Sequence, residues 1–232
     1  MTKLRLEITK GEEIRYISHL DYARTMERAL RRSKMPVAYS EGFNPHMKMS
    51  FASALSVGVT SEAEYMEVEL SKPVSAEKVF AALAHQLPPT IAIKRVKEVV
   101  GKQKALMAMV NLAVYKIVMP WHGDQMEYVA KDAVSRFNRT ETVLYVKENP
   151  KGNREIDIKK YIAEAVEVVV GPKGAELSMV VWITPQGSVK PSEVLKVLVE
   201  DFAFPGSFEA ALIKRSGLYV QIDHERLSPM EM

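Results

Sequence analysis

The sequence predicts an α+β protein built from two successive units of the same plan. In residues 1–100, strand-like segments that alternate apolar and polar residues are interleaved with two amphipathic helical segments. The order strand, helix, two strands, helix, strand then repeats in residues 110–226, in pattern and not in letters. This order is the β-α-β-β-α-β plan of a ferredoxin-like lobe, so we expect two such lobes in tandem.

The elements of the first lobe follow from local patterns. Alternation of Lys, Leu, Arg, Leu, Glu and Ile predicts a strand over residues 3–8. Ser18 stands three residues before Asp21, which is an N-cap pattern and predicts a helix from about His19 to Ser33. The remaining elements are a short strand at 37–39, extended chain over 47–59, a strand at 65–70, a helix at 76–87 and a strand at 91–100.

Residues 101–109 are expected to link the lobes, and residues 227–232 to form a loose tail. The segment 158–171 suits either a helix or a strand, and the pattern leaves it open. In the second lobe we expect strands at 110–119, 142–146 and 177–184, helices at 126–137 and 194–202, and strand material at 211–213 and 218–222.

Composition excludes several classes of protein. Hydrophobic residues make up 47% of the 232, enough for a core, so a disordered chain is excluded. The chain has no cysteine, so it cannot itself form a disulfide, supply a thiol nucleophile or hold an iron–sulfur cluster through cysteine. A charged N-terminus and the lack of any run of about 18 apolar residues predict a cytoplasmic protein without membrane contact.

The helix at 19–33 carries the first candidate site. At about 100° per residue, four guanidinium groups share one face, opposite an apolar stripe; they belong to Arg24, Arg28, Arg31 and Arg32. Arginine suits phosphate oxygens, so this face is a candidate surface for an anion or RNA. Lys34 and Lys48 could extend it, and we expect Lys3 and Arg5 of the first strand to lie nearby. The alternative is a solvated face whose arginines pair with nearby acids.

The start of the helix and the loop at 40–46 carry the second candidate. Ser18 and His19 stand at a helix N-terminus, which favours an anion. In the loop, Phe43 could stack on a base and Asn44 could add a polar contact. His19 and His46 are chemically suitable as an acid–base pair for RNA cleavage, but the sequence does not place them side by side. With Asp21 they lack a diagnostic metal spacing, so no metal site is predicted.

These residues and their neighbours resemble those of a known family. The stretch from Tyr16 to Leu70 is similar to the radical-SAM-linked proteins, an uncharacterised bacterial family also classed as a domain of unknown function. The matching positions are Ser18-His19-Leu20-Asp21, Arg24, Glu27-Arg28, Arg31-Arg32, Pro36, Ser40 to Pro45, Gly58 and Ser61-Glu62. The resemblance implies a protein encoded beside, or fused to, a radical SAM protein, and it implies no reaction. In fold alone, the tandem lobes also resemble RNA-processing proteins of CRISPR systems.

The leading functional hypothesis is a non-catalytic accessory protein that binds RNA or presents substrate to a radical SAM partner. One alternative is a stand-alone, metal-independent endoribonuclease that uses His19 or His46. Another is a protein-interaction module that docks on the radical SAM partner. Motifs of NTPases, dehydrogenases, esterases and zinc proteases are absent from the sequence, and we expect no cofactor. The RNA target, the substrate and the oligomeric state are not predicted.

Overall fold

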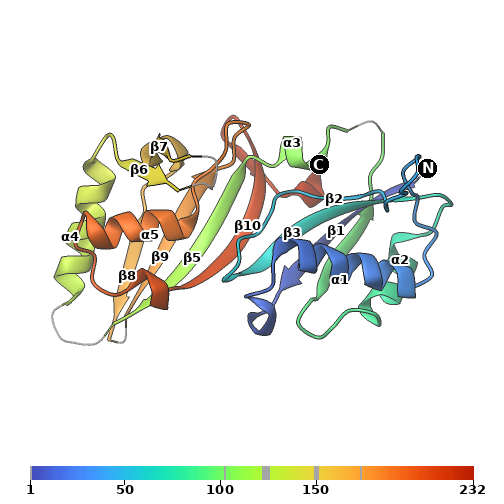
Figure 1. Cartoon of the computed structure of the whole chain (residues 1–232), viewed down its shortest axis with the longest axis horizontal. Helices are drawn as coiled ribbons and strands as arrows, with labels where there is room; N and C mark the ends of the chain where they lie inside the picture. The colour runs from blue at the N-terminus through green and yellow to red at the C-terminus, as the bar shows by residue number, and fades with distance from the viewer. Residues whose placement is uncertain (1, 102, 122–125, 149–151, 173) are drawn as a thin grey trace. The chain divides into compact units, whose positions relative to one another are not determined.

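The computed structural model describes residues 2–101, 103–121, 126–148, 152–172 and 174–232. This part of the chain holds five α-helices and eleven β-strands, which confirms the predicted α+β class (Figure 1). It contains no helix long and apolar enough to cross a membrane. The chain divides into two compact units, Met1–Asn111 with Gly217–Met232, and Leu112–Ser216.

This division differs from the expected bounds at the C-terminal end. Residues 217–232 pack with the first unit, although we assigned most of them to the second lobe and the last six to a loose tail. They form β11 (Glu225–Leu227) and a short 3-10 helix (Pro229–Glu231) that is capped by Ser228. Pro229 and Met230 are buried, so the apolar side chains of this segment hold it in place.

The expected linker is also part of the first unit. It contains the short helix α3 (Leu106–Met109), whose Leu106 is buried. Lys102 of the expected linker lies outside the described residues.

In the first unit, two helices pack on one face of an antiparallel sheet (Figure 1). The strand order is β4-β1-β3, and β2 also pairs with β3. Leu4, Leu6 and Ile8 alternate along β1 and belong to the core under the helices. The elements in chain order are β1 (Thr2–Lys10), α1 (His19–Arg32), β2 (Met49–Phe51), β3 (Val59–Leu70), α2 (Ala76–Ala84) and β4 (Ile93–Glu98).

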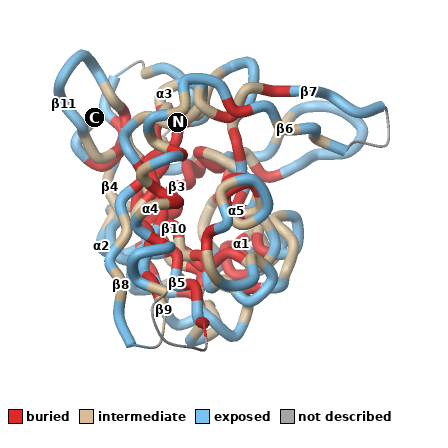
Figure 2. The backbone as a smooth tube through the Cα atoms, turned by 90° about the vertical axis from the view of Figure 1, so that its left-hand side faces the viewer, coloured by how far each residue is buried: buried red, intermediate tan, exposed pale blue. Residues whose placement is uncertain are grey.

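The second unit has the strand order β10-β5-β9-β8, with β10 contributing its first half. A separate β6–β7 hairpin interrupts the chain after α4, and it is largely exposed (Figure 2). The elements are β5 (Leu112–Pro120), α4 (Met126–Arg139), β6 (Leu144–Lys147), β7 (Arg154–Asp157), β8 (Glu167–Gly171), β9 (Gly174–Trp182), α5 (Pro191–Glu200) and β10 (Leu212–Ile222). The segment that the sequence left open holds a 3-10 turn, Ile158–Tyr161, followed by β8.

Candidate functional site

Helix α1 begins where the sequence predicted. The Ser18 hydroxyl accepts a hydrogen bond from the backbone N–H of Asp21 at 3.1 Å and donates one to its Oδ2 atom at 2.7 Å. The hydrogen bond from Ser18, followed by the bond and charge of Arg24, holds the pKa of the exposed Asp21 carboxyl below its ordinary value. Asp21 is therefore ionised near neutral pH, and it occupies the N-terminus that we considered for a bound anion.

The apolar stripe of α1 is buried as predicted. Tyr22, Met26, Ala29 and Leu30 are at most 1% exposed. They pack in the core with residues of β1 and β3. This packing sets the rotation of the helix, and the arginine face consequently points to solvent.

The four arginines of α1 differ in their partners. Arg24 pairs with Asp21 at 3.2 Å and Arg31 with Glu27 at 2.6 Å, and both arginine side chains stay more than 60% exposed. Arg32 donates a hydrogen bond to the backbone carbonyl of Gln86 at 2.6 Å. These contacts support part of the alternative in which the arginines pair with nearby acids.

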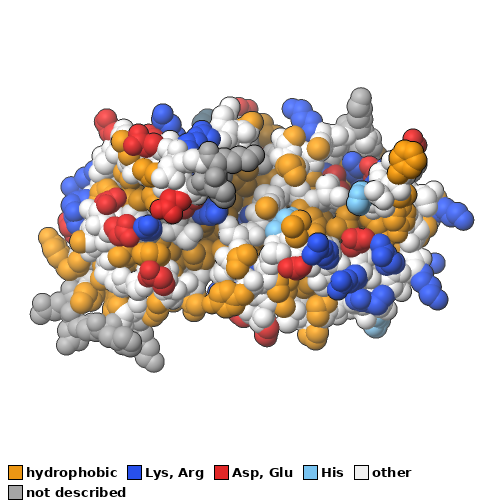
Figure 3. Space-filling view, in the orientation of Figure 1, with side chains coloured by type: hydrophobic (Ala, Val, Ile, Leu, Met, Phe, Trp, Pro, Cys, Tyr) orange, Lys and Arg blue, Asp and Glu red, His pale blue; other side chains and the backbone are white. Residues whose placement is uncertain are grey.

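Arg28 is the exception. It is exposed and makes no hydrogen bond or ion pair with any residue that the structure describes. Lys and Arg side chains gather over α1 (Figure 3). Exposed pairs of the Arg24–Asp21 kind contribute little to stability because water screens them, so a phosphate group could replace their carboxylates at little cost. The face can therefore offer up to four guanidinium groups to an anion.

The two candidate histidines are held by different parts of the first unit. The His19 ring meets Phe51 edge-on, with 5.0 Å between the ring centroids. His46 is exposed at the end of the loop, where its backbone N–H and C=O both bond to Ser40. Among the described residues, no group of three or more His, Cys, Asp or Glu side chains could hold a metal ion.

The loop at 40–46 closes on itself. The backbone N–H of Ser40 donates to the carbonyl of His46 at 2.8 Å, and a bridge joins Tyr39 to Met47 just outside the loop. Phe43 and Asn44 stand exposed at its tip, and the Phe43 side chain has no protein cover at all, with 106% relative exposure. The loop therefore presents an aromatic ring on a braced backbone.

The expectation that Lys3 and Arg5 lie near the arginine face was wrong, because they alternate with the core residues Leu4 and Leu6 along β1 and so lie on the sheet face opposite α1. Arg5 is 0% exposed, because Glu67, Gln103 and the carbonyl of Pro229 surround its guanidinium group. Lys48 lies beside β2, and its ammonium is 3.7 Å from Glu69. The polar cluster around the Arg5 guanidinium group was not predicted, because Glu67, Gln103 and Pro229 come from distant segments of the chain.

Comparison with known proteins identifies the family. Residues 3–191 match the family described as "Uncharacterized protein conserved in bacteria (DUF2344)". The chain belongs to this family. Membership confirms the part of the resemblance that concerned an uncharacterised bacterial family, and the family description names no radical SAM partner. No curated protein matches the sequence.

In fold, the chain is similar to a chain of the solved structure titled "Crystal Structure of a Cbf5-Nop10-Gar1 Complex". The TM-score is 0.54 and the sequence identity is 10%, over 99% of this chain and 52% of that chain. The DUF2344 chain thus spans about half the length of that chain. At this level of identity the likeness concerns the fold alone.

Proposed function

We propose that this protein is a non-catalytic RNA-binding accessory that holds RNA phosphates on the arginine face of α1. The observation that carries the proposal is the exposed Arg28, which makes no hydrogen bond or ion pair among the described residues, lies close enough to lower the pKa of Asp21 by its charge, and stands in a row with Arg24 and Arg31. Burial of a guanidinium donor in a phosphate contact is favourable, since the planar fork matches two phosphate oxygens.

The charge balance of α1 supports an anionic partner. The helix carries four arginines against the two acids Asp21 and Glu27, so its net charge is positive. Its last turn holds Arg31 and Arg32, and neither residue is buried. Electrostatic attraction of this kind is independent of RNA sequence and depends strongly on salt.

The loop at 40–46 supplies a second type of contact. An exposed aromatic ring is a stacking platform for an unpaired base, and stacking is worth about 1–3 kcal/mol per base. Phe43 is such a ring, and Asn44 beside it offers an amide that can both donate and accept hydrogen bonds. We infer that this loop favours unpaired over paired bases, whereas most of the affinity comes from α1.

A radical SAM protein is the proposed partner in the cell. The proposal rests on the family resemblance of Tyr16 to Leu70, together with the absence of cysteine from this chain. The iron–sulfur cluster that such chemistry needs would then belong to the partner. Under this proposal the present chain presents RNA, and the partner modifies it.

We also propose that each unit is a ferredoxin-like lobe, as in RNA-processing proteins of CRISPR systems. The strand orders support the assignment, since β4-β1-β3-β2 and β10-β5-β9-β8 place corresponding strands in corresponding positions. Both units also follow the order strand, helix, two strands, helix, strand, apart from the inserted β6–β7 hairpin.

An experiment on α1 tests the RNA proposal against the alternatives. Replacing Arg24, Arg28 and Arg31 with Glu should abolish binding of single-stranded RNA at low salt without unfolding the protein. The matched control is a variant of α4 in which Lys131, Arg136 and Arg139 are replaced with Glu. Helix α4 has the same length as α1 and also carries exposed i,i+4 ion pairs. An equal loss of RNA binding in the α1 and α4 variants would show that net charge alone causes it, and would contradict a specific RNA site on α1.

The same protein preparations address the two alternatives. Incubation of the wild type with cellular RNA in EDTA tests for a metal-independent endoribonuclease, and cleavage that is lost in His19→Ala or His46→Ala would favour it. Co-purification of a radical SAM protein that persists after nuclease treatment, and is lost in the α1 variant, would favour direct docking through this helix.

A further inference from the structure

Strand β8 forms one edge of the sheet in the second unit. Among the described strands it pairs with β9 alone, so one side of its backbone has no neighbouring strand. The strand reads Glu-Val-Val-Val-Gly, and its one charged residue, Glu167, stands at its start. It holds neither lysine nor proline, the residues that commonly keep an edge from pairing, and its central Val169 is 71% exposed. Another strand can therefore add to the sheet at β8.

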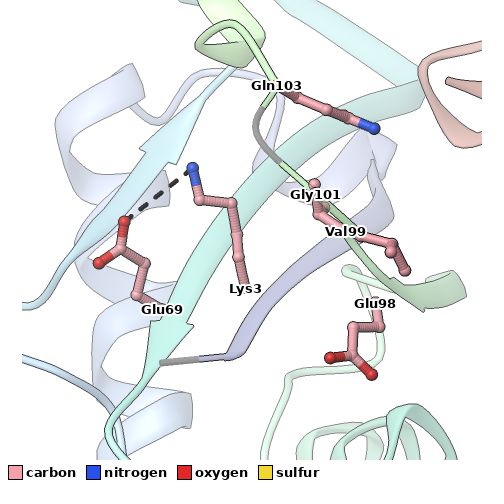
Figure 4. Close-up of a pocket in the computed structure, with 7 residues that line it drawn as sticks. Lys3, Glu69, Glu98, Val99, Gly101 and Gln103 are labelled. Atoms are coloured by element: carbon pink, nitrogen blue, oxygen red, sulfur yellow. Dashed lines mark ion pairs between the residues drawn. The ribbon is translucent and has the colours of Figure 1, made fainter.

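The edge strand of the first unit is different. Strand β4 carries Lys94, Arg95 and Lys97, and charged side chains of this kind discourage edge-to-edge pairing. Its last residue, Glu98, is charged as well, and its carboxylate is turned away from the Lys3 ammonium of the neighbouring β1 (Figure 4). The charges that protect the edge of the first unit have no counterpart along the valines of β8.

Hydrogen bonds of Asn138 show which backbone groups of β8 face outward. This side chain of α4 donates from Nδ2 to the Val166 carbonyl at 2.8 Å and accepts from the Val166 N–H at 2.9 Å, as a pairing strand would. Backbone groups alternate in direction along an antiparallel strand, so the N–H and C=O groups of Val168 and Val170 point to the same side. Outside the β8–β9 ladder, neither backbone forms a hydrogen bond with any residue that the structure describes. Their donors and acceptors are available to another strand.

A second copy of β8 matches these groups when it runs antiparallel about a two-fold axis at Val169. Val168 of each copy then lies opposite Val170 of the other. Each of these two pairs exchanges two N–H···O bonds, which makes four hydrogen bonds in all. A two-fold axis makes the contact self-complementary, so one exposed edge is sufficient for both partners.

Other registers leave some of the groups without partners. With the axis at Val168, Val170 would lie opposite Val166, whose backbone groups Asn138 already holds. With the axis at Val170, Val168 would lie opposite Pro172, which has no N–H to donate. A shift by one residue would set the outward groups of one strand against the inward groups of the other. The axis at Val169 is therefore the register that satisfies the edge.

The side chains also suit this register. The two copies of Val169 form the central pair, which is of the type without hydrogen bonds, so their side chains come close and cover apolar surface. Glu167 lies opposite Gly171, which has no side chain. The two Glu167 residues are about 13 Å apart along the strands, beyond the Debye length of about 10 Å at 0.1 M salt. Repulsion between these carboxylates is therefore weak.

We propose that β8 pairs antiparallel with β8 of a second copy of this chain, about a two-fold axis at Val169. The pairing joins the sheets of two second units into one continuous sheet. It uses neither α1 nor the loop at 40–46, so it goes beyond the proposed RNA surface and is tested separately from it. A contact of this size belongs to the weak class of interfaces, and association should depend on protein concentration.

One introduced cysteine tests the register, because the chain has no cysteine of its own. Opposed residues in a pair without hydrogen bonds have Cα atoms about 4.5 Å apart, within the range that a disulfide spans. Val169→Cys should therefore give a covalent dimer under mild oxidation, seen on a non-reducing gel. The matched control is Val118→Cys, since Val118 is 44% exposed but lies on β5, two strands in from the edge, and it should stay largely monomeric.

Sedimentation equilibrium of the cysteine-free protein measures the association itself. Between about 10 and 300 µM, the mean mass of the wild type should rise from that of the monomer toward that of the dimer. Val169→Lys places two like charges at the axis and should keep the protein monomeric, with an unchanged circular dichroism spectrum because Val169 is exposed. Glu167→Lys brings a lysine opposite Gly171 instead, where it should leave association intact.

The proposal is overturned if the wild type stays monomeric over this range of concentration. It is also overturned if Val118→Cys forms the covalent dimer as fast as Val169→Cys. Association of Val169→Lys that equals that of the wild type would overturn it too, because the contact would then lie elsewhere on the molecule.

Discussion

Arg5 and Glu67 form a buried ion pair on the face of the first sheet opposite the helices. The Nε and Nη2 atoms of Arg5 donate to the same Glu67 oxygen at 3.0 and 2.6 Å, and both residues are less than 5% exposed. The C-terminal segment covers the pair, since the backbone carbonyl of Pro229 accepts a hydrogen bond from Nη1 of Arg5, while the side-chain carbonyl of Gln103 accepts one from Nη2. The ion pair therefore links the first strand of the chain to its last residues.

Breaking this pair should be strongly destabilising. Glu67→Ala leaves the Arg5 charge buried without its counter-ion, and we expect a loss of about 3–5 kcal/mol in the free energy of unfolding. Replacing both residues with Met removes both charges and should cost much less. Urea denaturation of the two variants measures the difference, and an equal loss in both would contradict the account.

The N-cap of α1 gives a smaller, local effect. Ser18→Ala removes the acceptor for the Asp21 N–H group, and we expect a loss of about 1 kcal/mol in the free energy of unfolding. The same substitution at Ser75 in α2 should cost less, because its hydrogen bond to the N–H of Lys78 is longer, at 3.4 Å. Thermal denaturation followed by circular dichroism compares the two, and a larger loss at Ser75 would oppose this ranking.

The turn between β8 and β9 requires glycine at one of its two ends. A Cβ atom on Gly174 would overlap the backbone carbonyl of Met119 and lie 3.0 Å from Cα of Pro120, at a φ of +149°. Gly174→Ala should therefore destabilise the protein by about 1–3 kcal/mol or more. Gly171 faces Gly174 across the same turn and has only an ordinary contact there, so Gly171→Ala is the matched control in chemical denaturation. Equal tolerance of both would refute the turn geometry.

Ionisation of the Tyr65 phenol should lower the free energy of unfolding at alkaline pH. Burial raises the pKa of its phenol to about 12, and the unfolded chain has the ordinary value of 10.0. The neutral phenol is thus favoured in the folded state, and its contribution is complete below about pH 10 and is lost as the pH rises toward 12. Denaturation at about pH 9 and pH 11 should show a smaller alkaline loss in Tyr65→Phe than in the wild type. Identical losses would exclude Tyr65 as the cause.

Local signals in the sequence were sufficient for α1. The Ser18 cap and the spacing of the stripe from Tyr22 to Leu30 depend on residues within one helix, and the structure confirms both. The burial of Arg5 could not be predicted from local patterns, because Pro229, one of the residues that cover it, lies far along the chain. The same contact explains why the tail expected to be loose is packed.

In the second unit, too, local patterns did not predict every element. The pattern predicted β6 approximately, but the pairing partner β7 has no strong alternation and was missed. The helix expected from residue 194 begins earlier, at Pro191, because proline suits the first turn of a helix. Strand register and side-chain burial depend on tertiary contacts, which local patterns in one sequence do not show.

The salt dependence of RNA affinity tests the central claim most directly. For a fluorescein-labelled single-stranded RNA, the logarithm of the association constant should fall linearly with the logarithm of salt concentration, with a slope of about −2 for three phosphate contacts. Replacing Arg24, Arg28 and Arg31 with Gln should bring that slope close to zero, while Phe43→Ala should lower affinity and leave the slope unchanged. A wild type that binds no RNA at low salt, or an arginine variant with the wild-type slope, would contradict the proposal that α1 holds RNA phosphates.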